Sequence, residues 1–437
     1  MVGKHPGKAN VFMNVNDRSK IAIIGGGASG MMAALVAARG GATVTIYEHM
    51  DRIGKKILMT GNGKCNFSNL SFSDKDYHTN NTDLIKSVFG QFSNQDAMNF
   101  FIKNGVLVKE KNQYLYPLTE QASTILDLFR RELEQSGVTI HTSYEVSKIV
   151  VMKDRSASGQ EQNLFKIQDD PTVYQKVIIA CGGKAAPKSG SDGSGYRLAQ
   201  TLGHEVIQPL PALVQLRSSE SYFKAIAGVR TEAILKLCVE GKVITEESGE
   251  MQLTDYGISG IPVFQLSGLA AMALSEKKRV EVIIDFIPSV SKEDLKEYIT
   301  EQGMRFQNAE VPPLLEEILQ GLMNKKIVMM LMKQSGMKAD IKINQLAPLE
   351  LDKLLGRIKK WYVKITNTNP FANAQVCRGG IDCMQVSHSC ESLLIPGIYF
   401  TGEILNVDGR CGGYNLQWAW SSGVVAGLHA CQSMQKR

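Results

Sequence analysis

Long apolar runs are absent from this chain of 437 residues. No stretch reaches the roughly 20 apolar residues that a helix needs to cross a bilayer. Residues 1–18 contain only the short apolar patch Val11–Met13, which is too little for the core of a secretion signal. These absences predict a cytoplasmic protein without a membrane partner, and a flexible leader over residues 1–18.

Paired metal-binding motifs are also missing. The eight cysteines include no CxxC pair, which argues against a zinc site. Cys377, Cys383 and Cys390 are spaced by six and seven residues, so a redox pair or a metal site stays open there beside the interpretation as free thiols. No arginine-rich stripe is visible, and the net charge of +6 is small. We therefore expect no metal and no nucleic-acid partner, whereas the oligomeric state is not indicated.

A glycine pattern near the start of the chain points to a nucleotide. Residues 21–48 read IAIIGGGASGMMAALVAARGGATVTIYE, in which Gly25, Gly27 and Gly30 form GxGxxG between an apolar run and an alanine-rich segment. A second apolar run ends at Glu48. The first glycine allows a tight turn, the second allows a pyrophosphate to approach, and the third allows close helix packing. This segment predicts a strand–helix–strand unit that binds a dinucleotide, with Glu48 on a ribose.

FAD and NAD share this fingerprint, so the choice depends on the later chain. Glycines and polar residues follow soon after Glu48, where FAD would continue from its diphosphate towards the flavin. A strand pair near Val146 offers backbone groups to an adenine edge. The final segment contains a strand, a glycine–acid turn and a helix that opens at Gly412 or Gly413. The four segments concerned are residues 52–69, 138–150, 176–196 and 395–427.

The chain resembles, over nearly its whole length, the bacterial FAD-dependent oxidoreductases of the aminoacetone oxidase family, which includes the BaiN-type bile-acid reductases. The motifs that carry this resemblance are Gly25 to Gly30, GNGKCN at 61–66, ACGG at 180–183, LTDYGISGIPVFQLS at 253–267, CRGGI at 377–381 and GGYNLQWAWSSG at 412–423. The sequence departs from the family at Arg410 and Cys411, where proline and threonine are usual, and over residues 382–387, which lack the usual polar run. These departures weaken any transfer of substrate.

The resemblance implies a non-covalent FAD site. Glu48 would hold the adenosine ribose, Val146 the adenine, Gly402 and Glu403 the ribityl and phosphate end, and residues 413–415 the pyrimidine edge of the flavin. A helix amino terminus at that edge would stabilise the negative charge that reduction places there. The full set of predicted cofactor-binding residues is Gly25, Gly27, Ala28, Ser29, Gly30, Glu48, Lys56, Gly61, Asn62, Gly63, Lys64, Cys65, Asn66, Val146, Ala180, Cys181, Gly182, Gly402, Glu403, Gly413, Tyr414 and Asn415.

The fold class that we predict is α/β, with a Rossmann-like, glutathione-reductase-like FAD-binding domain formed by residues 19–205 and 366–437. Residues 206–365 would form an inserted substrate domain, β-rich over 206–287 and with a helical cap over 288–361. Five methionines crowd the cap. They either pack in its core or form an adaptable surface for apolar ligands.

The chain shows no hydrolytic triad and no second nucleotide domain, which leaves the redox chemistry to the flavin. Arg378 is the candidate cation near an anionic substrate or the flavin, and Tyr414 is a candidate proton donor. We favour an FAD-dependent reductase that takes electrons from NADH or NADPH and reduces an apolar small molecule such as an enone. An oxygen-using amine oxidase and an FAD-dependent tRNA-modifying protein remain the alternatives.

Overall fold

The computed structural model describes residues 19–155 and 161–432, which fold into two compact units. Unit 1 comprises Met1–Gly183, Lys188–Ile207 and Gly379–Arg437, and unit 2 comprises Lys184–Pro187 and Gln208–Arg378. The predicted leader, residues 1–18, lies outside the described residues. Within the described ranges, no helix combines the length and the apolar character that crossing a membrane requires.

A five-stranded parallel sheet forms the centre of unit 1. Its order is β21 (Ile398–Phe400), β11 (Lys176–Ile179), β1 (Lys20–Ile24), β2 (Thr43–Tyr47) and β7 (Thr139–His141). The inner strands β1 and β11 are almost fully buried apolar runs, as expected for parallel strands covered on both faces. This arrangement confirms the predicted Rossmann-like fold.

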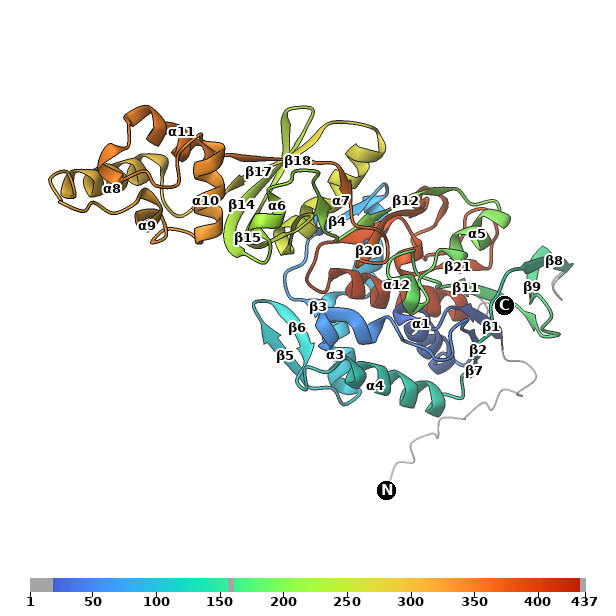
Figure 1. Ribbon diagram of the computed structural model, residues 1–437. Helices are drawn as coiled ribbons and strands as arrows, with labels where there is room; N and C mark the ends of the chain where they lie inside the picture. The colour runs from blue at the N-terminus through green and yellow to red at the C-terminus, as the bar shows by residue number, and fades with distance from the viewer. Residues whose placement is uncertain (1–18, 156–160, 433–437) are drawn as a thin grey trace, which may run out of the picture. The chain divides into compact units, whose positions relative to one another are not determined.

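The first and last helices of unit 1 pack against each other, as Figure 1 shows in blue and red: α1 (Ala28–Arg39) and α12 (Tyr414–Gln432). Two glycines of α12 make this close approach possible. A Cβ on Gly423 would lie 2.6 Å from the Ser29 carbonyl oxygen, and one on Gly427 would lie 2.7 Å from the Ala33 carbonyl oxygen. The small residues of both helices therefore fix how α12 lies on α1.

Smaller elements surround this sheet. A three-stranded antiparallel sheet has the order β3 (Ser68–Asn69), β6 (Tyr114–Pro117) and β5 (Val108–Lys111), and a pair joins β22 (Val407–Gly409) to β4 (Tyr77–Thr79). The remaining helices of unit 1 are α2 (Thr82–Gln91), α3 (Asn94–Lys103), α4 (Ala122–Gln135) and α5 (Ser194–Thr201). The antiparallel sheet β10 (Val173–Tyr174), β9 (Glu161–Ile167) and β8 (Ile149–Arg155) contacts β1 and β11.

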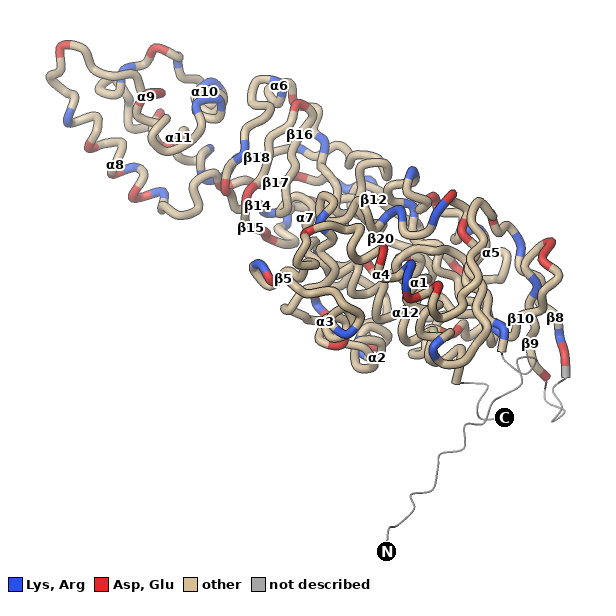
Figure 2. The backbone as a smooth tube through the Cα atoms, turned by 90° about the horizontal axis from the view of Figure 1, so that it is seen from below, with Lys and Arg blue, Asp and Glu red and all other residues tan. Residues whose placement is uncertain are grey.

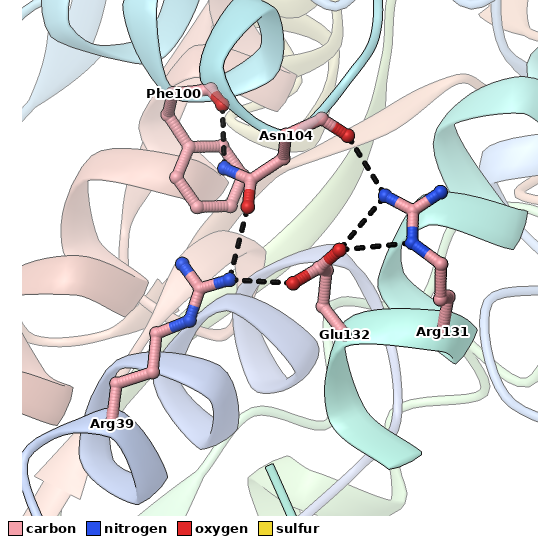
Figure 3. A network of polar contacts seen from close by, with 5 residues as sticks. All are labelled: Arg39, Phe100, Asn104, Arg131 and Glu132. Carbon is pink, nitrogen blue, oxygen red and sulfur yellow. Dashed lines mark hydrogen bonds and ion pairs between the residues drawn. The ribbon is translucent and has the colours of Figure 1, made fainter. Parts of the chain in front are cut away.

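A charged network fastens the carboxyl ends of α1 and α3 to α4, as Figure 3 shows. Glu132 accepts hydrogen bonds from Arg39 at 2.7 Å and from Arg131 at 2.8 and 3.0 Å. Asn104 accepts from Arg39 through its side chain and from Arg131 through its backbone carbonyl. The hydrogen bonds from Arg131 contribute most to holding the pKa of Glu132 below its usual value.

We expect Glu132→Gln to lower the free energy of unfolding by about 1 kcal/mol at pH 7, because both arginines are largely exposed and screened by solvent. The pKa of Glu132 is lower in the folded state, so its contribution is complete above the unfolded value of about 4.3 and is lost as the pH falls further. Urea unfolding at pH 7 and pH 3.5 measures this. Glu134→Gln, an exposed change in the same helix, is the control and should have no effect at either pH.

Unit 2 is built on a seven-stranded antiparallel sheet. Its order is β18 (Trp361–Ile365), β17 (Val280–Asp285), β14 (Arg230–Val239), β15 (Lys242–Thr254), β16 (Gly257–Gly260), β13 (Leu216–Arg217) and β19 (Asn367–Thr368). The helices α6 (Phe223–Ile226) and α7 (Ile261–Ser275) pack on it. Strands β13 to β17 lie within residues 206–287, where the sequence predicts a β-rich part, whereas β18 and β19 follow the helical cap.

The helical cap of unit 2 contains α8 (Lys292–Arg305), α9 (Leu315–Leu319), α10 (Lys325–Gln334) and α11 (Pro348–Lys359). Three of its methionines are at most 9% exposed: Met330, Met332 and Met337. They pack in the apolar core that the cap shares with the sheet. These three methionines therefore give no support to an apolar ligand surface, because their side chains are occupied by core packing.

The chain passes between the two units along β12 (Val206–Ala212) and β20 (Val376–Ile381), which pair with each other. Unit 2 begins its long segment at Gln208, and the chain returns to unit 1 at Gly379 rather than at residue 366. The later return arises because β18 and β19 both belong to the sheet of unit 2.

Candidate functional site

The turn after β1 contains two kinds of glycine. At some positions a side chain would clash with the protein, and at one position there is open space. A Cβ on Gly25 would lie 2.5 Å from the Ala180 carbonyl oxygen, and one on Gly30 would lie 2.0 Å from the Gly25 carbonyl oxygen. A Cβ on Gly27, at the N-cap of α1, meets no atom within 4 Å. Gly25 and Gly30 are therefore needed by the fold, whereas the space beside Gly27 is free for a ligand at the helix amino terminus.

Glu48 closes this turn from the end of β2. One carboxylate oxygen accepts a hydrogen bond from the Gly26 N–H at 2.8 Å, and the other accepts from the Met50 N–H at 2.8 Å. The side chain is 8% exposed. Each oxygen has a second lone-pair direction. Glu48 can thus shape the turn and still accept hydrogen bonds from ribose hydroxyls.

A second group of predicted residues meets at the amino-terminal end of α1. The Lys56 ammonium lies 2.6 Å from a Glu403 carboxylate oxygen and 3.4 Å from the Ser191 hydroxyl. A Cβ on Gly402, whose φ is +74°, would lie 2.6 Å from the Ser29 hydroxyl oxygen. This places Lys56, Glu403, Gly402 and Ser29 together although they are far apart in sequence.

The loop GNGKCN has an unusual backbone. Gly61, Asn62, Gly63 and Cys65 all have positive φ, between 54° and 84°. Two of these residues, Asn62 and Cys65, are not glycine, and non-glycine residues in this region store strain of the kind found at functional sites. The Lys64 ammonium pairs with Glu120 at 3.6 Å and is half exposed.

Cys65 is fully buried, and desolvation raises the pKa of its thiol to about 12. Burial likewise raises the pKa of Cys181, which lies beside Ala180 at the end of β11, to about 12. Both thiols stay protonated at neutral pH and are poor nucleophiles. These two predicted cofactor contacts can therefore act only by shape or through the backbone.

Val146 lies between β7 and β8, in a stretch that contacts the residues following β2. The Tyr144 N–H donates to the Glu48 carbonyl at 2.9 Å, and the Ser147 N–H donates to the Gln168 side chain at 2.9 Å. Among the described residues, the backbone N–H and carbonyl of Val146 have no hydrogen-bond partner. A free donor and acceptor at one residue match the edge of an adenine.

The amino terminus of α12 is held rigidly by its preceding loop. Gly413 has a φ of +93°, and a Cβ there would lie 2.4 Å from the Ser68 carbonyl oxygen. The Asn415 side chain accepts from the Gly409 N–H at 2.9 Å and donates to the Gly409 carbonyl at 2.8 Å. The side chain of Asn415 thus fixes the loop, and the first-turn N–H groups of α12 lack intrahelical acceptors.

Tyr414 packs in this loop, where Tyr77 donates a hydrogen bond to its backbone carbonyl at 2.8 Å. Desolvation is the main cause that raises the pKa of Tyr414 above its usual value. A phenol with a raised pKa keeps its proton at neutral pH and is a weak acid, which limits Tyr414 as a proton donor.

Arg378 belongs to unit 2, not to the unit that carries the glycine turn. A Cβ on Gly268 of α7 would lie 2.7 Å from the centre of its guanidinium, which also approaches the Met272 sulfur at 3.8 Å. The sequence did not indicate this packing role. Its predicted role beside the flavin or an anionic substrate stays a prediction.

The cysteine-rich stretch forms neither a disulfide nor a metal cluster. None of the eight cysteines, all of which the structure describes, forms a disulfide, and no group of metal-binding side chains occurs within residues 19–155 and 161–432. Burial raises the pKa of Cys383 to about 12 and raises that of Cys390 further. Cys411 also has a raised pKa because of desolvation, so it is not an activated thiol.

Sequence reasoning missed Gly26 and Ser191. A Cβ on Gly26 would lie 2.4 Å from the Ile53 side chain, so any other residue at this position would have to displace Ile53. The run of three glycines at 25–27 was the available signal. No local signal marks Ser191, because its contact with Lys56 joins residues 135 apart.

The parallel sheet, the glycine turn and Glu48 together define a dinucleotide-binding protein of the Rossmann type. More narrowly, the chain belongs to the family described as HI0933-like protein Rossmann domain, which it matches over residues 19–429. It is an FAD-dependent oxidoreductase with a Rossmann-like FAD-binding domain, and the predicted family is confirmed.

Three curated relatives cover nearly the whole chain. A 3-dehydro-bile acid delta(4,6)-reductase of Clostridium scindens is 40% identical over 419 residues, 95% of this chain and 99% of the relative. A ribosomal RNA dihydrouridine synthase of Haemophilus influenzae is 31% identical over 93% of this chain and 97% of the relative. The ribosomal RNA dihydrouridine synthase of Escherichia coli is 30% identical over 93% of this chain and 96% of the relative. The two RNA-modifying names mean that the absence of a nucleic-acid partner stays a prediction.

Proposed function

We propose that this protein reduces a carbon–carbon double bond conjugated to a carbonyl group, with non-covalent FAD as cofactor and NADH or NADPH as electron donor. The observation that carries this proposal is the 40% identity, over 95% of the chain, to a protein named as a delta(4,6)-reductase of a 3-dehydro compound. Such a name describes double bonds conjugated to an oxo group. Eight cysteines without a disulfide among the described residues favour a reducing compartment, and we propose the cytoplasm.

The residues of unit 1 suit the cofactor. The open space at Gly27 would accept a pyrophosphate, Glu48 would accept from the ribose, and the free backbone groups of Val146 would pair with the adenine. FAD, when bound, supplies hydride-transfer chemistry that no side chain provides. The chain itself contributes orientation and electrostatics.

The amino terminus of α12 would hold the pyrimidine edge of the flavin. Its unpaired first-turn N–H groups and helix dipole stabilise negative charge, and the Asn415–Gly409 hydrogen bonds keep them in place. This feature serves a reductase and an oxidase equally. The relative named as a reductase therefore decides the direction that we propose.

A uracil ring in ribosomal RNA is the second candidate substrate. Dihydrouridine differs from uridine by saturation of a ring double bond conjugated to a carbonyl, which is the same chemistry. The two relatives with this name, at 31% and 30% identity, favour it. Acidic and basic positions alternate along α8 (Figure 2), so that helix offers no continuous basic face to a phosphate backbone. The identity to these two relatives is lower than the 40% identity to the reductase, and α8 carries charges of both signs. For these two reasons we favour a small molecule over RNA as the substrate.

Anaerobic stopped-flow spectroscopy tests the reaction. We expect NADH or NADPH to bleach the flavin absorbance within seconds, and a 3-oxo-Δ4 steroid to restore it with formation of the saturated ketone. An unmodified ribosomal RNA fragment, offered to the same reduced enzyme, should leave the flavin bleached.

Three other outcomes would redirect the proposal. Restoration by the RNA with dihydrouridine formation would establish the second candidate. Bleaching by a primary amine, with hydrogen peroxide in air and no response to nicotinamides, would establish the amine oxidase alternative. A bleached flavin that neither substrate restores would refute reduction of a conjugated double bond.

A further inference from the structure

A cavity of about 670 Å³ lies within unit 2, beside α7 and the edge strand β19. Its volume falls in the range of roughly 300–1,000 Å³ that is typical of small-molecule sites. One wall is apolar and consists of Leu210, Pro211, Ala271, Leu274, Pro370 and Phe371. This wall can cover an apolar body several carbon atoms long.

The lining of the cavity also includes a cation, the Arg217 side chain, which is held by two contacts. The Arg217 guanidinium donates to the Asn369 side chain at 2.9 Å and lies over the Tyr256 ring, 5.1 Å from its centroid. Asn369 is only 5% exposed, and its amide nitrogen donates to Gln215 at 3.2 Å. A buried amide and an aromatic ring thus orient this guanidinium before any ligand arrives.

No carboxylate neutralises this cation. Among the described residues, Arg217 forms no ion pair within 4 Å, and neither does Lys184, whose ammonium lies 5.0 Å from the centroid of the Phe371 ring. Phe371 belongs to the cavity wall. The cavity therefore has an apolar wall and two unneutralised cations next to it, and this combination attracts anions.

We propose that this cavity binds an amphipathic organic carboxylate. The carboxylate would accept the remaining guanidinium N–H groups of Arg217, which suit a planar anion with two oxygens, and the apolar body would cover Leu274 and Phe371. A single fixed guanidinium favours a carboxylate over more highly charged anions. The site lies wholly in unit 2, so the proposal does not depend on the reaction assigned to the flavin.

Isothermal titration calorimetry on the FAD-loaded enzyme tests the proposal with three probes. Decanoate carries both features, acetate carries only the charge, and decanamide carries only the chain. We expect decanoate to bind at least tenfold more tightly than either of the others. Arg217→Gln should weaken decanoate at least tenfold, the loss expected for a charge-assisted hydrogen-bond pair, and should leave decanamide unchanged.

Two further variants separate the site from general charge effects. Arg230→Gln removes another exposed arginine of the same unit, which pairs with Glu250, and should not change decanoate binding. Lys184→Gln should weaken decanoate by roughly two- to fivefold, since its charge lies behind the wall. Equal losses in Arg217→Gln and Arg230→Gln, unchanged affinity in Arg217→Gln, or no binding of decanoate at millimolar concentration would each overturn the proposal.

Discussion

Gly27→Val should produce a folded protein that has lost FAD. Gly27 has φ −79° and ψ −169°, extended values that valine adopts, and its Cβ meets no protein atom within 4 Å. The two methyl groups would instead fill the space that the pyrophosphate needs. We expect the dissociation constant for FAD to rise more than 100-fold and the purified protein to be colourless, measured by absorbance at 450 nm and by titration of the apoprotein.

Two other glycines supply the controls. Gly90→Val, in α2, also places its Cβ in open space and should keep both fold and FAD. Gly30→Val places its Cβ 2.0 Å from the Gly25 carbonyl oxygen and should prevent correct folding. The N-cap change alone should reduce the stability of Gly27→Val by only about 1 kcal/mol. A folded, yellow Gly27→Val protein would show that the cofactor lies elsewhere.

Glu48→Gln should weaken FAD binding about 10- to 100-fold. The carboxylate accepts one backbone N–H on each oxygen, whereas the glutamine NH2 group cannot accept and would face an N–H donor. Losing a charge-assisted hydrogen bond of this kind costs roughly 1.5–3 kcal/mol. Calorimetric titration of FAD into the two apoproteins measures the difference.

The matched control is Glu145→Gln, an exposed glutamate near the same strand end. It should bind FAD as the unmodified protein does. Equal affinities for Glu48→Gln and the unmodified protein would exclude the proposed role of the Glu48 carboxylate in FAD binding.

The sequence predicted those features whose partners are close in the chain. The turn at Gly25–Gly30 and the acid after the second strand follow from local spacing, and the structure brings them together. The sequence could not predict that both carboxylate oxygens of Glu48 accept hydrogen bonds from backbone N–H groups. These hydrogen bonds depend on how the backbone folds at residues 26 and 50. The spacing from the glycines predicts an acidic residue at position 48. Which backbone groups donate hydrogen bonds to its carboxylate is known only from the folded structure.

Local sequence patterns could not predict contacts between segments that are far apart in the chain. Lys56 and Glu403 are 347 residues apart, and nothing in either segment indicates that they form an ion pair. The methionines of the cap suggested a ligand surface as readily as a core, because composition does not say which side of a helix is covered. The return of the chain at Gly379 likewise depends on strands that pair at the edges of a sheet.

The packing of α12 on α1 also constrains how the protein is made. α1 is synthesised well before Gly423 and Gly427, which contact it and lie almost 400 residues further along the chain. Until then the parallel sheet lacks β21, and the nascent chain lacks the α12 terminus proposed for the flavin. Unit 2 contains a continuous segment from Gln208 to Arg378 and can complete its core earlier. FAD can therefore stabilise unit 1 fully only after α12 has been synthesised, although α1 and the glycine turn are made much earlier.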